Sequence, residues 1–425
     1  MTNSKMSRRD FMRTSAAVSA AAMLSPTRNV FAAGSDKIRI GLIGCGRRGT
    51  DAAKDCVTAA PNVEVVAMGD LFQDHLDKSL AKLSREVDDK VSVTKDTCFV
   101  GFDAYEKVIA CDVDLLILAA PPHFRPKHLK AAVEAGKHIF MEKPVAVDPV
   151  GVRSVIAASE LAEQKALAIV AGTQRRHQEH YLEVLKRVHD GAIGEIVGGQ
   201  CYWNGGGMLK WGPEDDPRWS QMERQCRRWL FYTWLSGDHI VEQHVHNIDI
   251  INWAIGDHPV KCIGMGGRQV RTAPEYGNIF DHFAVEFEYP NGVRVMSMCR
   301  QTKGCSDRVA ERVVGTKGSA YTNGSNGSID GLNAYKYDGE SPDPYEQEHA
   351  DLIASIRNGK PLNEGKRIAE STMTAIMGRM SAYTGRALKW DWIMNASELD
   401  LTPPKYEFGD LPVRPVAVPG KTKLV

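Results

Sequence analysis

Short apolar runs separated by helical stretches mark the first third of the chain. Four runs rich in β-branched and other apolar residues each end at a polar or glycine-rich turn: 37–43 (KIRIGLI), 63–70 (VEVVAMGD), 114–119 (DLLILA) and 138–144 (HIFMEKP). Continuous apolar runs of this length are typical of strands that are buried on both faces. Because helical patterns such as 128–137 (HLKAAVEAGK) lie between them, the sequence predicts an α/β fold with a doubly wound parallel sheet.

The pattern changes to strict alternation later in the chain. Every second residue of 282–289 (HFAVEFEY) is apolar or aromatic, and the tripeptide 290–292 (PNG) separates this run from 293–298 (VRVMSM). Asn-Gly between alternating runs is a strong hairpin signal, so antiparallel strands are expected here. Helices are expected at 345–361 and 366–385, and the proline-rich residues after Pro403 are expected to pack as an extended strap.

The first residues have the pattern of an export signal. A basic start that includes Arg8 and Arg9 precedes a weakly apolar stretch at 16–24, and Ala32 and Ala33 follow as small residues at a cleavage site. The stretch 7–12 (SRRDFM) resembles the twin-arginine motif. We therefore expect residues 1–33 to be a signal peptide for the twin-arginine export machinery, and the protein to be periplasmic or otherwise exported. No stable membrane span is expected, because no apolar run is long enough.

Charge and cysteine content narrow the classes of partner. Lys plus Arg and Asp plus Glu both number 53, so the formal net charge is zero. Without a basic excess a phosphate backbone is poorly neutralised, and no nucleic-acid partner is expected. Nine cysteines in a chain of 425 residues do not suggest a disulfide scaffold.

A glycine-rich loop follows the first predicted strand and precedes a helical stretch. Its residues Gly44, Gly46 and Gly49 have the GxGxxG spacing of a dinucleotide-binding turn, in the strand–turn–helix context that this motif requires. Asp70 ends the second strand, 21 residues after Gly49, where a carboxylate can bind the ribose 2′-hydroxyl. The carboxylate favours NAD over NADP, although the loop arginines 47 and 48 could accept a 2′-phosphate if they folded over the adenine ribose.

Further cofactor-binding residues are expected where the other strands end, because ligands bind at the carboxyl edge of doubly wound sheets. The expected set consists of loop residues and of residues that directly follow a strand: Gly44, Gly46, Arg47, Arg48, Gly49, Asp70, Ala120, Pro121, His123, Glu142 and Lys143.

These motifs together resemble the Gfo/Idh/MocA oxidoreductases, the relatives of glucose–fructose oxidoreductase and inositol 2-dehydrogenase. The resemblance rests on the stretches 135–144 (AGKHIFMEKP), 116–122 (LILAAPP), 191–196 (GAIGEI) and 385–391 (GRALKWD), and it covers roughly residues 37–390. It implies a Rossmann NAD-binding domain at 36–165 and a substrate-binding and oligomerisation domain at 166–400. The second domain would contain an open, mostly antiparallel sheet, with 401–425 as an extended tail. A homo-oligomer, dimer or tetramer, is expected by the same analogy.

The resemblance also implies the catalytic residues. Family members carry Asp-x-Gly-x-His-x-x-Asp-x-x-x-Trp on a helix facing the nicotinamide, and His246, Asp249 and Trp253 match that pattern in 236–253 (SGDHIVEQHVHNIDIINW). Glu242 stands where the family usually has Asp, and His244 where it usually has Gly. By resemblance His246 is the general base, Glu242 its orienting or relay carboxylate, and Lys143 the cation beside the substrate oxygen.

Substrate-binding residues are expected to include aromatic rings, which stack on the C–H faces of sugars, and polar groups. The candidates lie just before the catalytic stretch, within it, or at the start of the second domain: Arg175, Trp229, Tyr232, Trp234 and Asp249. A metal site is an alternative, because His239, Glu242 and His246 lie at roughly helical spacing, with Asp238 adjacent. The family's chemistry requires none, so no metal ligand is predicted.

The expected function is that of an exported NAD(P)-dependent oxidoreductase acting on a secondary alcohol of a sugar, polyol or glycoside. Its NAD is expected to be tightly bound, because an exported enzyme cannot draw on cytoplasmic NAD. One alternative is an NAD-dependent glycoside hydrolase, which oxidises C3 transiently and then eliminates the leaving group. Another is a nucleotide-bound sugar-binding protein without activity.

Overall fold

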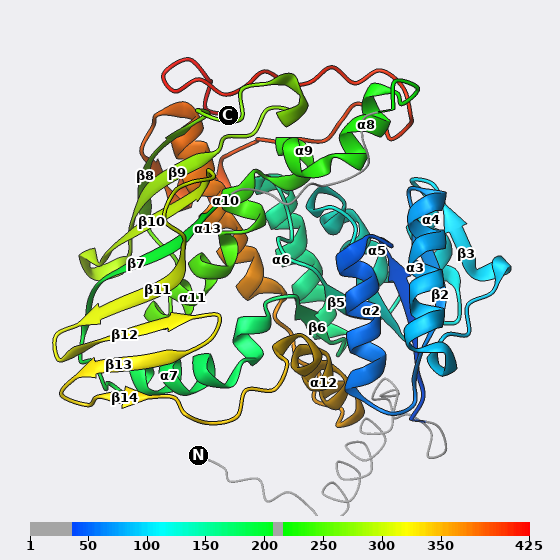
Figure 1. Ribbon diagram of the computed structural model, residues 1–425, viewed down its shortest axis with the longest axis horizontal. Coiled ribbons are helices and arrows are strands. Elements are labelled where there is room, and N and C mark those ends of the chain that lie inside the picture. Colours follow the sequence, from blue (N-terminus) through cyan, green and yellow to red (C-terminus); the bar gives the residue numbers. More distant parts are fainter. Residues whose placement is uncertain (1–35, 207–215) are drawn as a thin grey trace, which may run out of the picture. The chain divides into compact units, whose positions relative to one another are not determined.

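The first sheet confirms the predicted doubly wound parallel architecture. The computed structural model describes residues 36–206 and 216–425, so the expected signal peptide lies outside the described residues. Six parallel strands run in the order β3-β2-β1-β4-β5-β6 (Figure 1). They are β1 (Ile38–Ile43), β2 (Val63–Asp70), β3 (Cys98–Val100), β4 (Leu115–Leu118), β5 (His138–Met141) and β6 (Ile169–Ala171).

Amphipathic helices connect these strands and bury their apolar sides against the sheet. They are α2 (Arg47–Ala59), α3 (Gln73–Glu86), α4 (Ala104–Ala110), α5 (Arg125–Glu134) and α6 (Pro149–Gln164). All four residues of β4 are buried, as expected for a central strand with helices on both sides. Helix α6 begins after Asp148, whose carboxylate accepts the Gly151 backbone N–H at 2.7 Å and caps the helix.

Strand β6 lies beyond residue 165, where the sequence suggested that the first domain ends. Its three buried residues pair with β5, so the parallel sheet continues to Ala171. A buried run this short has no periodicity that separates it from the end of the preceding helix. Residues 38–425 form one compact unit that contains both sheets.

The second sheet is mixed and mostly antiparallel, as the family resemblance implied. Its nine strands run in the order β14-β13-β12-β11-β7-β10-β9-β8-β15, and only β7 and β10 pair in parallel. They are β7 (Ile196–Gly205), β8 (Lys261–Gly267), β9 (His282–Glu288), β10 (Arg294–Gln301), β11 (Arg308–Gly315), β12 (Gly318–Asn323), β13 (Gly327–Gly331), β14 (Tyr335–Lys336) and β15 (Leu388–Lys389).

The Asn-Gly hairpin is confirmed. Strands β9 and β10 pair antiparallel across Pro290–Gly292, with Glu288 opposite Arg294. Asn291 and Gly292 have φ of 64° and 78°, the left-handed backbone that these two residue types tolerate in a tight turn.

Eight further α-helices follow β6 in the described part of the chain. They are α7 (Glu179–His189), α8 (Gln221–Arg227), α9 (Thr233–Ser236), α10 (His239–Glu242), α11 (Val245–Ile255), α12 (Pro344–Arg357), α13 (Gly365–Thr384) and the short α14 (Trp390–Asn395). Helix α13 packs on α6 of the first sheet and on α11 and β8 of the second. It is buried along most of its length because it contacts both sides.

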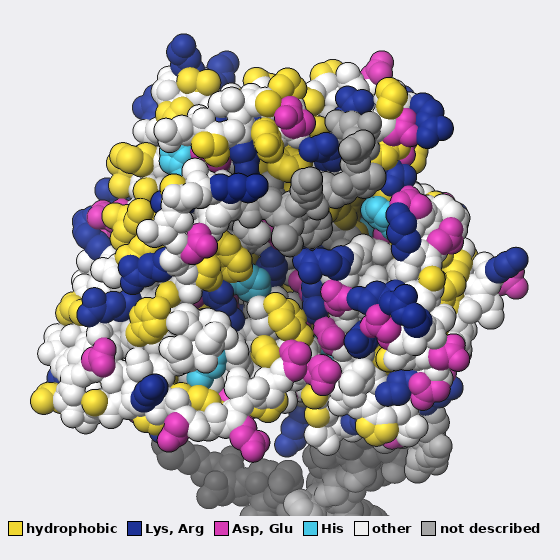
Figure 2. Space-filling model, viewed as in Figure 1, with side chains coloured by type: hydrophobic (Ala, Val, Ile, Leu, Met, Phe, Trp, Pro, Cys, Tyr) yellow, Lys and Arg dark blue, Asp and Glu magenta, His cyan; other side chains and the backbone are white. Residues whose placement is uncertain are grey.

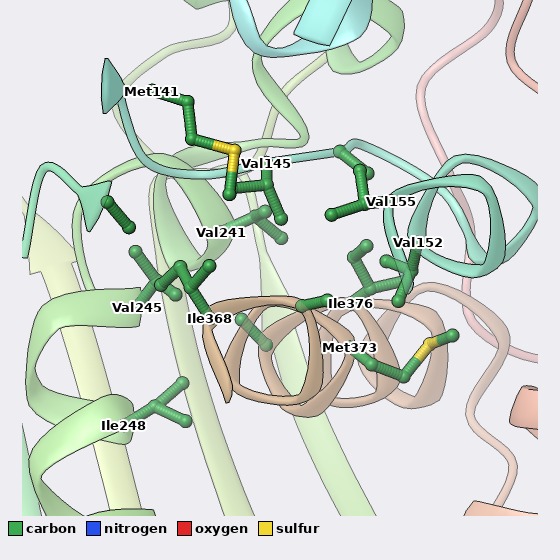
Figure 3. Packing of buried hydrophobic residues seen from close by; sticks show 14 of the residues in the cluster. Met141, Val145, Val152, Val155, Val241, Val245, Ile248, Ile368, Met373 and Ile376 are labelled. Carbon is green, nitrogen blue, oxygen red and sulfur yellow. The ribbon is translucent and has the colours of Figure 1, made fainter. Parts of the chain in front are cut away.

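One apolar core therefore runs from the first sheet to the second. Figure 3 shows Met141 and Val145, at and after the end of β5, beside Val241 and Val245 of α10 and α11, with Ile368 and Ile376 of α13 across from them. This packing fixes the end of β5 against the α10–α11 segment.

The C-terminal residues after Leu401 contain no regular helix or strand, as expected for a strap. Within the described residues no helix combines the length and apolarity needed to cross a bilayer.

Candidate functional site

The glycine loop after β1 has the close backbone contacts that its sequence predicts. Gly44 has φ of 100°, and a Cβ there would lie 2.3 Å from the backbone nitrogen of Ala120. A Cβ on Gly49 would lie 1.9 Å from the carbonyl oxygen of Gly44. Gly46 differs, because a Cβ there would meet nothing within 4 Å. Two glycines are thus needed by the protein's own packing, and the third leaves open space at the start of α2 where a phosphate could approach.

Asp70 is fixed at the end of β2 by its neighbours' backbone. Its two carboxylate oxygens accept the N–H groups of Cys45 at 2.6 Å and Phe72 at 2.8 Å, and His75 Nδ1 lies 3.4 Å away. A carboxylate has further lone pairs after accepting these two hydrogen bonds, so it can still accept from a ribose hydroxyl.

A cavity opens in front of the glycine loop and Asp70. Several predicted cofactor-binding residues line it: Gly44, Gly46, Arg47, Arg48, Gly49, Asp70, Ala120 and Pro121. Aromatic residues that the sequence analysis did not single out complete the wall: Phe72, Phe102, Tyr105, Phe124 and His128. Their signal was available, since Phe72 and Phe102 each stand two residues after the end of a strand.

The guanidinium of Arg48 is paired with carboxylates near the end of β5. It lies 2.6 Å from Glu142, 3.2 Å from Asp55 and 3.6 Å from the fully buried Glu348 of α12. Arg48 therefore has a structural role that competes with the predicted binding of cofactor. The side chain joins α2 to β5 and α12, and these ion pairs oppose its rotation toward a 2′-phosphate. Glu142, also a predicted cofactor residue, is occupied by the same pair.

Lys143 and Glu242, separated by 99 positions in sequence, meet in the fold. The Lys143 ammonium donates to the backbone carbonyl oxygen of Glu242 at 2.5 Å and to its Oε1 at 3.1 Å. Both side chains are largely buried, with 12% and 15% exposed. Because an ammonium has three donors, one remains for a substrate oxygen.

His246 lies in α11 with its ring stacked near Trp203 of β7, the ring centroids 5.9 Å apart. Burial lowers the pKa of His246 well below its ordinary value, and the positive charges of Lys143, Arg175 and Arg48 lower it further. The ring is therefore neutral at neutral pH, as a general base must be before it accepts a proton. Its Nδ1 is buried and has no hydrogen-bond partner among the described residues.

The stretch 236–253, which carries the predicted catalytic residues, does not form one continuous helix. Helix α10 ends at Glu242, helix α11 begins at Val245, and Gln243 between them has a φ of −109°. Glu242 and His246 therefore lie on different helices. In the structure the Glu242 carboxylate accepts a hydrogen bond from Lys143.

His244 is part of the interior. The side chain is fully buried, and its Nε2 lies 2.8 Å from the Ser297 hydroxyl. Burial lowers the pKa of His244 to about 3, so the ring is neutral. The departure from glycine at this position thus fills space under β10 and adds no charge to the site.

Two predicted substrate residues are occupied by buried ion pairs. Arg175 lies 2.7 Å from the buried Glu311. Asp249 accepts hydrogen bonds from Arg176 at 2.8 Å, from Arg367 at 3.2 Å and from the Ser371 hydroxyl at 2.8 Å. Burial would raise the pKa of Asp249, but the two guanidinium groups outweigh it, and the pKa is lowered. Both side chains therefore join elements of the fold, which matched spacing alone did not reveal.

The predicted aromatic substrate residues separate into two groups. Trp229 lines the cavity of the glycine loop. Tyr232 and Trp234 are buried in an apolar cluster, where Trp234 donates its indole N–H to Gln225 at 2.8 Å. His123, a predicted cofactor residue, hydrogen bonds with Tyr406 of the C-terminal tail at 2.9 Å.

The possible metal ligands do not form a site in the described part of the chain. No group of three or more His, Cys, Asp or Glu side chains is placed there to hold an ion. The carboxylate of Asp238 is taken by protein donors, the backbone N–H groups of His239 at 2.6 Å and Phe280 at 2.7 Å.

Comparison with protein families agrees with this geometry. Residues 38–173 match the model of an oxidoreductase family with an NAD-binding Rossmann fold, and residues 181–321 match the GFO/IDH/MocA C-terminal domain. Residues 5–25 match the signal sequence of the twin-arginine translocation pathway.

Among curated proteins, the chain is 23% identical to scyllo-inositol 2-dehydrogenase (NAD(+)) of Bacillus subtilis (strain 168), covering 67% of this chain and 73% of that protein. It is 25% identical to an inositol 2-dehydrogenase of Rhizobium meliloti (strain 1021), covering 66% and 74%. With an inositol 2-dehydrogenase of Klebsiella pneumoniae (strain 342) the match spans less than half, 45%, of that protein.

Two solved structures share the fold. An aldose-aldose oxidoreductase from Caulobacter crescentus, complexed with glycerol, has a TM-score of 0.64 at 18% identity, covering 83% of this chain and 99% of that one. An oxidoreductase from Agrobacterium radiobacter in complex with NAD+, L-tartaric acid and magnesium has a TM-score of 0.63 at 14% identity, covering 83% and 98%.

Proposed function

Because this chain belongs to the Gfo/Idh/MocA family of NAD-binding oxidoreductases, we propose that it transfers a hydride between a tightly held NAD and a secondary alcohol of a sugar, polyol or glycoside. The observation that carries the proposal is the contact of Lys143 with Glu242, at 2.5 and 3.1 Å. It brings the end of β5, at the carboxyl edge where cofactors bind, against the segment that holds His246.

NAD is favoured over NADP by the charge around the cavity. Asp70 is held in place by two backbone N–H groups, and its negative charge would repel a 2′-phosphate. The Arg48 guanidinium is already paired with Glu142 and Asp55. The open space at Gly46 is suited to a pyrophosphate at the start of α2.

The protein's own residues supply the proton transfer and the charge stabilisation. A bound nicotinamide would accept the hydride that leaves the alcohol carbon. The neutral His246 ring accepts the hydroxyl proton, and the Lys143 ammonium stabilises the developing alkoxide with its remaining donor. Glu242 restricts the ammonium to this position through two hydrogen bonds.

Replacing His246 tests the assignment. We expect His246→Ala to lower turnover by about 10²- to 10⁴-fold, because the general base is lost, with nucleotide binding retained. The control is His189→Ala, which removes an exposed ring whose Nε2 contacts the backbone of Trp253. Near-normal turnover of His246→Ala would end the assignment of the base.

The substrate class is tested with purified protein in two assays. The proposal expects NADH to accumulate with free sugars or polyols. Release of phenol from aryl glycosides without added NAD and without NADH build-up would instead support the glycoside hydrolase. Bound nucleotide with no turnover in either assay would support a sugar-binding protein.

Export and oligomerisation complete the proposal. The twin-arginine signal supports delivery to the periplasm, and that route suits a protein that loads NAD before it leaves the cytoplasm.

A homo-oligomer is supported by exposed apolar residues on one face of the second sheet. Met265 of β8 and Met298 of β10 both lie opposite Ala284 of β9, and 73% and 38% of their surfaces are exposed. In Figure 2 hydrophobic side chains gather over this sheet, whereas acidic and basic side chains are intermingled over the helices of the first sheet.

A further inference from the structure

The C-terminal tail contacts the outer side of the cavity that the proposed function assigns to NAD. The contacting segment, residues 402–411, is called here the C-terminal clasp. Its two aromatic residues, Tyr406 and Phe408, lie more than 280 positions after the strand ends that they touch (Tyr406 to His123, 283). Figure 1 shows the C-terminal segment, in red, passing beside α9 and α8.

Both rings of the clasp pack on residues that line the cavity. Phe408 stacks on Phe72 with the ring centroids 5.8 Å apart and lies 5.4 Å from Phe102. Tyr406 lies 5.9 Å from both Phe102 and Phe124. Phe72, Phe102 and Phe124 all line the cavity, and they come from the loops after β2, β3 and β4. The two tail rings therefore bridge three loops of the first sheet.

Polar contacts fix the clasp at both of its ends. The Tyr406 hydroxyl lies 2.9 Å from His123 Nε2, in the loop after β4. Burial lowers the pKa of His123 to about 4, so this is a contact with a neutral ring at physiological pH. On the other side, the Gly409 carbonyl accepts the Met222 backbone N–H at 3.1 Å.

Helix α8 connects the clasp to another part of the cavity wall. The Leu411 backbone N–H donates to Gln221 Oε1 at 2.8 Å, and the Leu411 carbonyl accepts from Gln225 Nε2 at 2.6 Å. Cys226 of the same helix, and Trp229 just after it, line the cavity. The clasp thus connects α8 to the loops of the first sheet around one opening.

We propose that the C-terminal clasp retains the dinucleotide by holding these walls together, so that release requires the clasp to detach. This inference rests on the proposed function. Loops after strands are the parts of such a site that move, and a bound dinucleotide leaves only when one wall opens. Opening would separate aromatic rings and break the Tyr406–His123 hydrogen bond. Because 47% of Phe408 is already exposed, detachment of the clasp would newly expose only part of this side chain to water.

The test measures release of NADH from the full mature chain. NADH bound to the protein is chased with excess NAD, and the loss of its bound-state fluorescence gives the dissociation rate. We expect the double variant Tyr406→Ala/Phe408→Ala to release NADH about tenfold faster, because the contacts of both rings with the cavity-lining loops are lost. The control is Val413→Ala, which shortens another tail side chain that is 49% exposed.

The outcomes separate the clasp from the proposed function. If the unmodified protein binds no NADH, the proposed function fails. If it binds NADH and the double variant releases it at the unmodified rate, the clasp is wrong. If the double variant does not fold, amide hydrogen exchange of the unmodified protein decides. Saturating NADH should slow exchange in residues 402–411, and equal exchange with and without NADH would overturn the proposal.

Discussion

At the residue scale, three glycines of one motif have different tasks. Gly44 and Gly49 are needed because their own backbone neighbours leave no room for a side chain, whereas Gly46 faces open space. The charged residues divide in the same way. Lys143 is near the proposed reaction centre with a donor left, while Asp249 is saturated by buried partners. Residue type and spacing did not distinguish these cases.

The glycine loop provides a matched pair of substitutions. We expect Gly46→Ala to leave the free energy of unfolding unchanged, because its φ of −70° suits alanine and its Cβ meets nothing. Its NAD dissociation constant should rise about tenfold, because the methyl group occupies the approach of the pyrophosphate. Gly49→Ala should destabilise the fold by about 2–3 kcal/mol, since its Cβ would overlap the Gly44 carbonyl. Calorimetry with and without NAD measures the stability and the NAD affinity of each variant. Equal effects of the two variants would contradict the different roles of Gly46 and Gly49.

At the element scale, the 3-10 turn Gln174–His177 (η4) joins the first sheet to α12 and α13. His177 Nδ1 lies 2.6 Å from Asp351 of α12, and its Nε2 lies 3.7 Å from Glu364. Arg176 of the same turn pairs with Asp249 of α11. These contacts hold the connection between the two sheets, and with it the approach of β5 to α10.

The ion pairs of His177 predict a dependence of stability on pH. Burial lowers the pKa of His177, but the hydrogen bond to Asp351 and the nearby negative charge of Glu364 outweigh it and raise the pKa to about 9. Because the folded state binds this proton more tightly than the unfolded state, the stabilisation is complete below about pH 6.5 and is lost as the pH rises through 9.

His177→Gln should therefore cost of the order of 3 kcal/mol near pH 6 and much less near pH 10. Urea unfolding at several pH values measures the difference between variant and unmodified protein. The exposed His189→Gln is the control. A difference that stays constant across this pH range would show that the pKa of His177 is not raised.

At the scale of the whole molecule, Met265 and Met298 leave apolar surface exposed on one face of the second sheet. If a second copy covers it, as we propose, Met265→Glu should convert the oligomer to a monomer, because burying an unpaired carboxylate is unfavourable. Sedimentation velocity measures the change. Leu332→Glu, at a position 80% exposed in the turn after β13, is the control and should leave the mass unchanged. An unmodified protein that sediments as a monomer would remove the proposal.

The sequence by itself determined the parallel strands of the first sheet, the glycine loop with Asp70, the Asn-Gly hairpin and the twin-arginine signal. These features are local, because periodicity and turn chemistry act over a few consecutive residues. Only the tertiary structure decided which charges pair. Arg48 pairs with Glu142, Glu242 with Lys143 and Asp249 with Arg176, across 94, 99 and 73 positions. It also decided that the C-terminal clasp, which has no regular helix or strand, contacts three loops that are distant from it in sequence. Such contacts depend on how buried side chains fill shared space, which no repeat or spacing along the chain records.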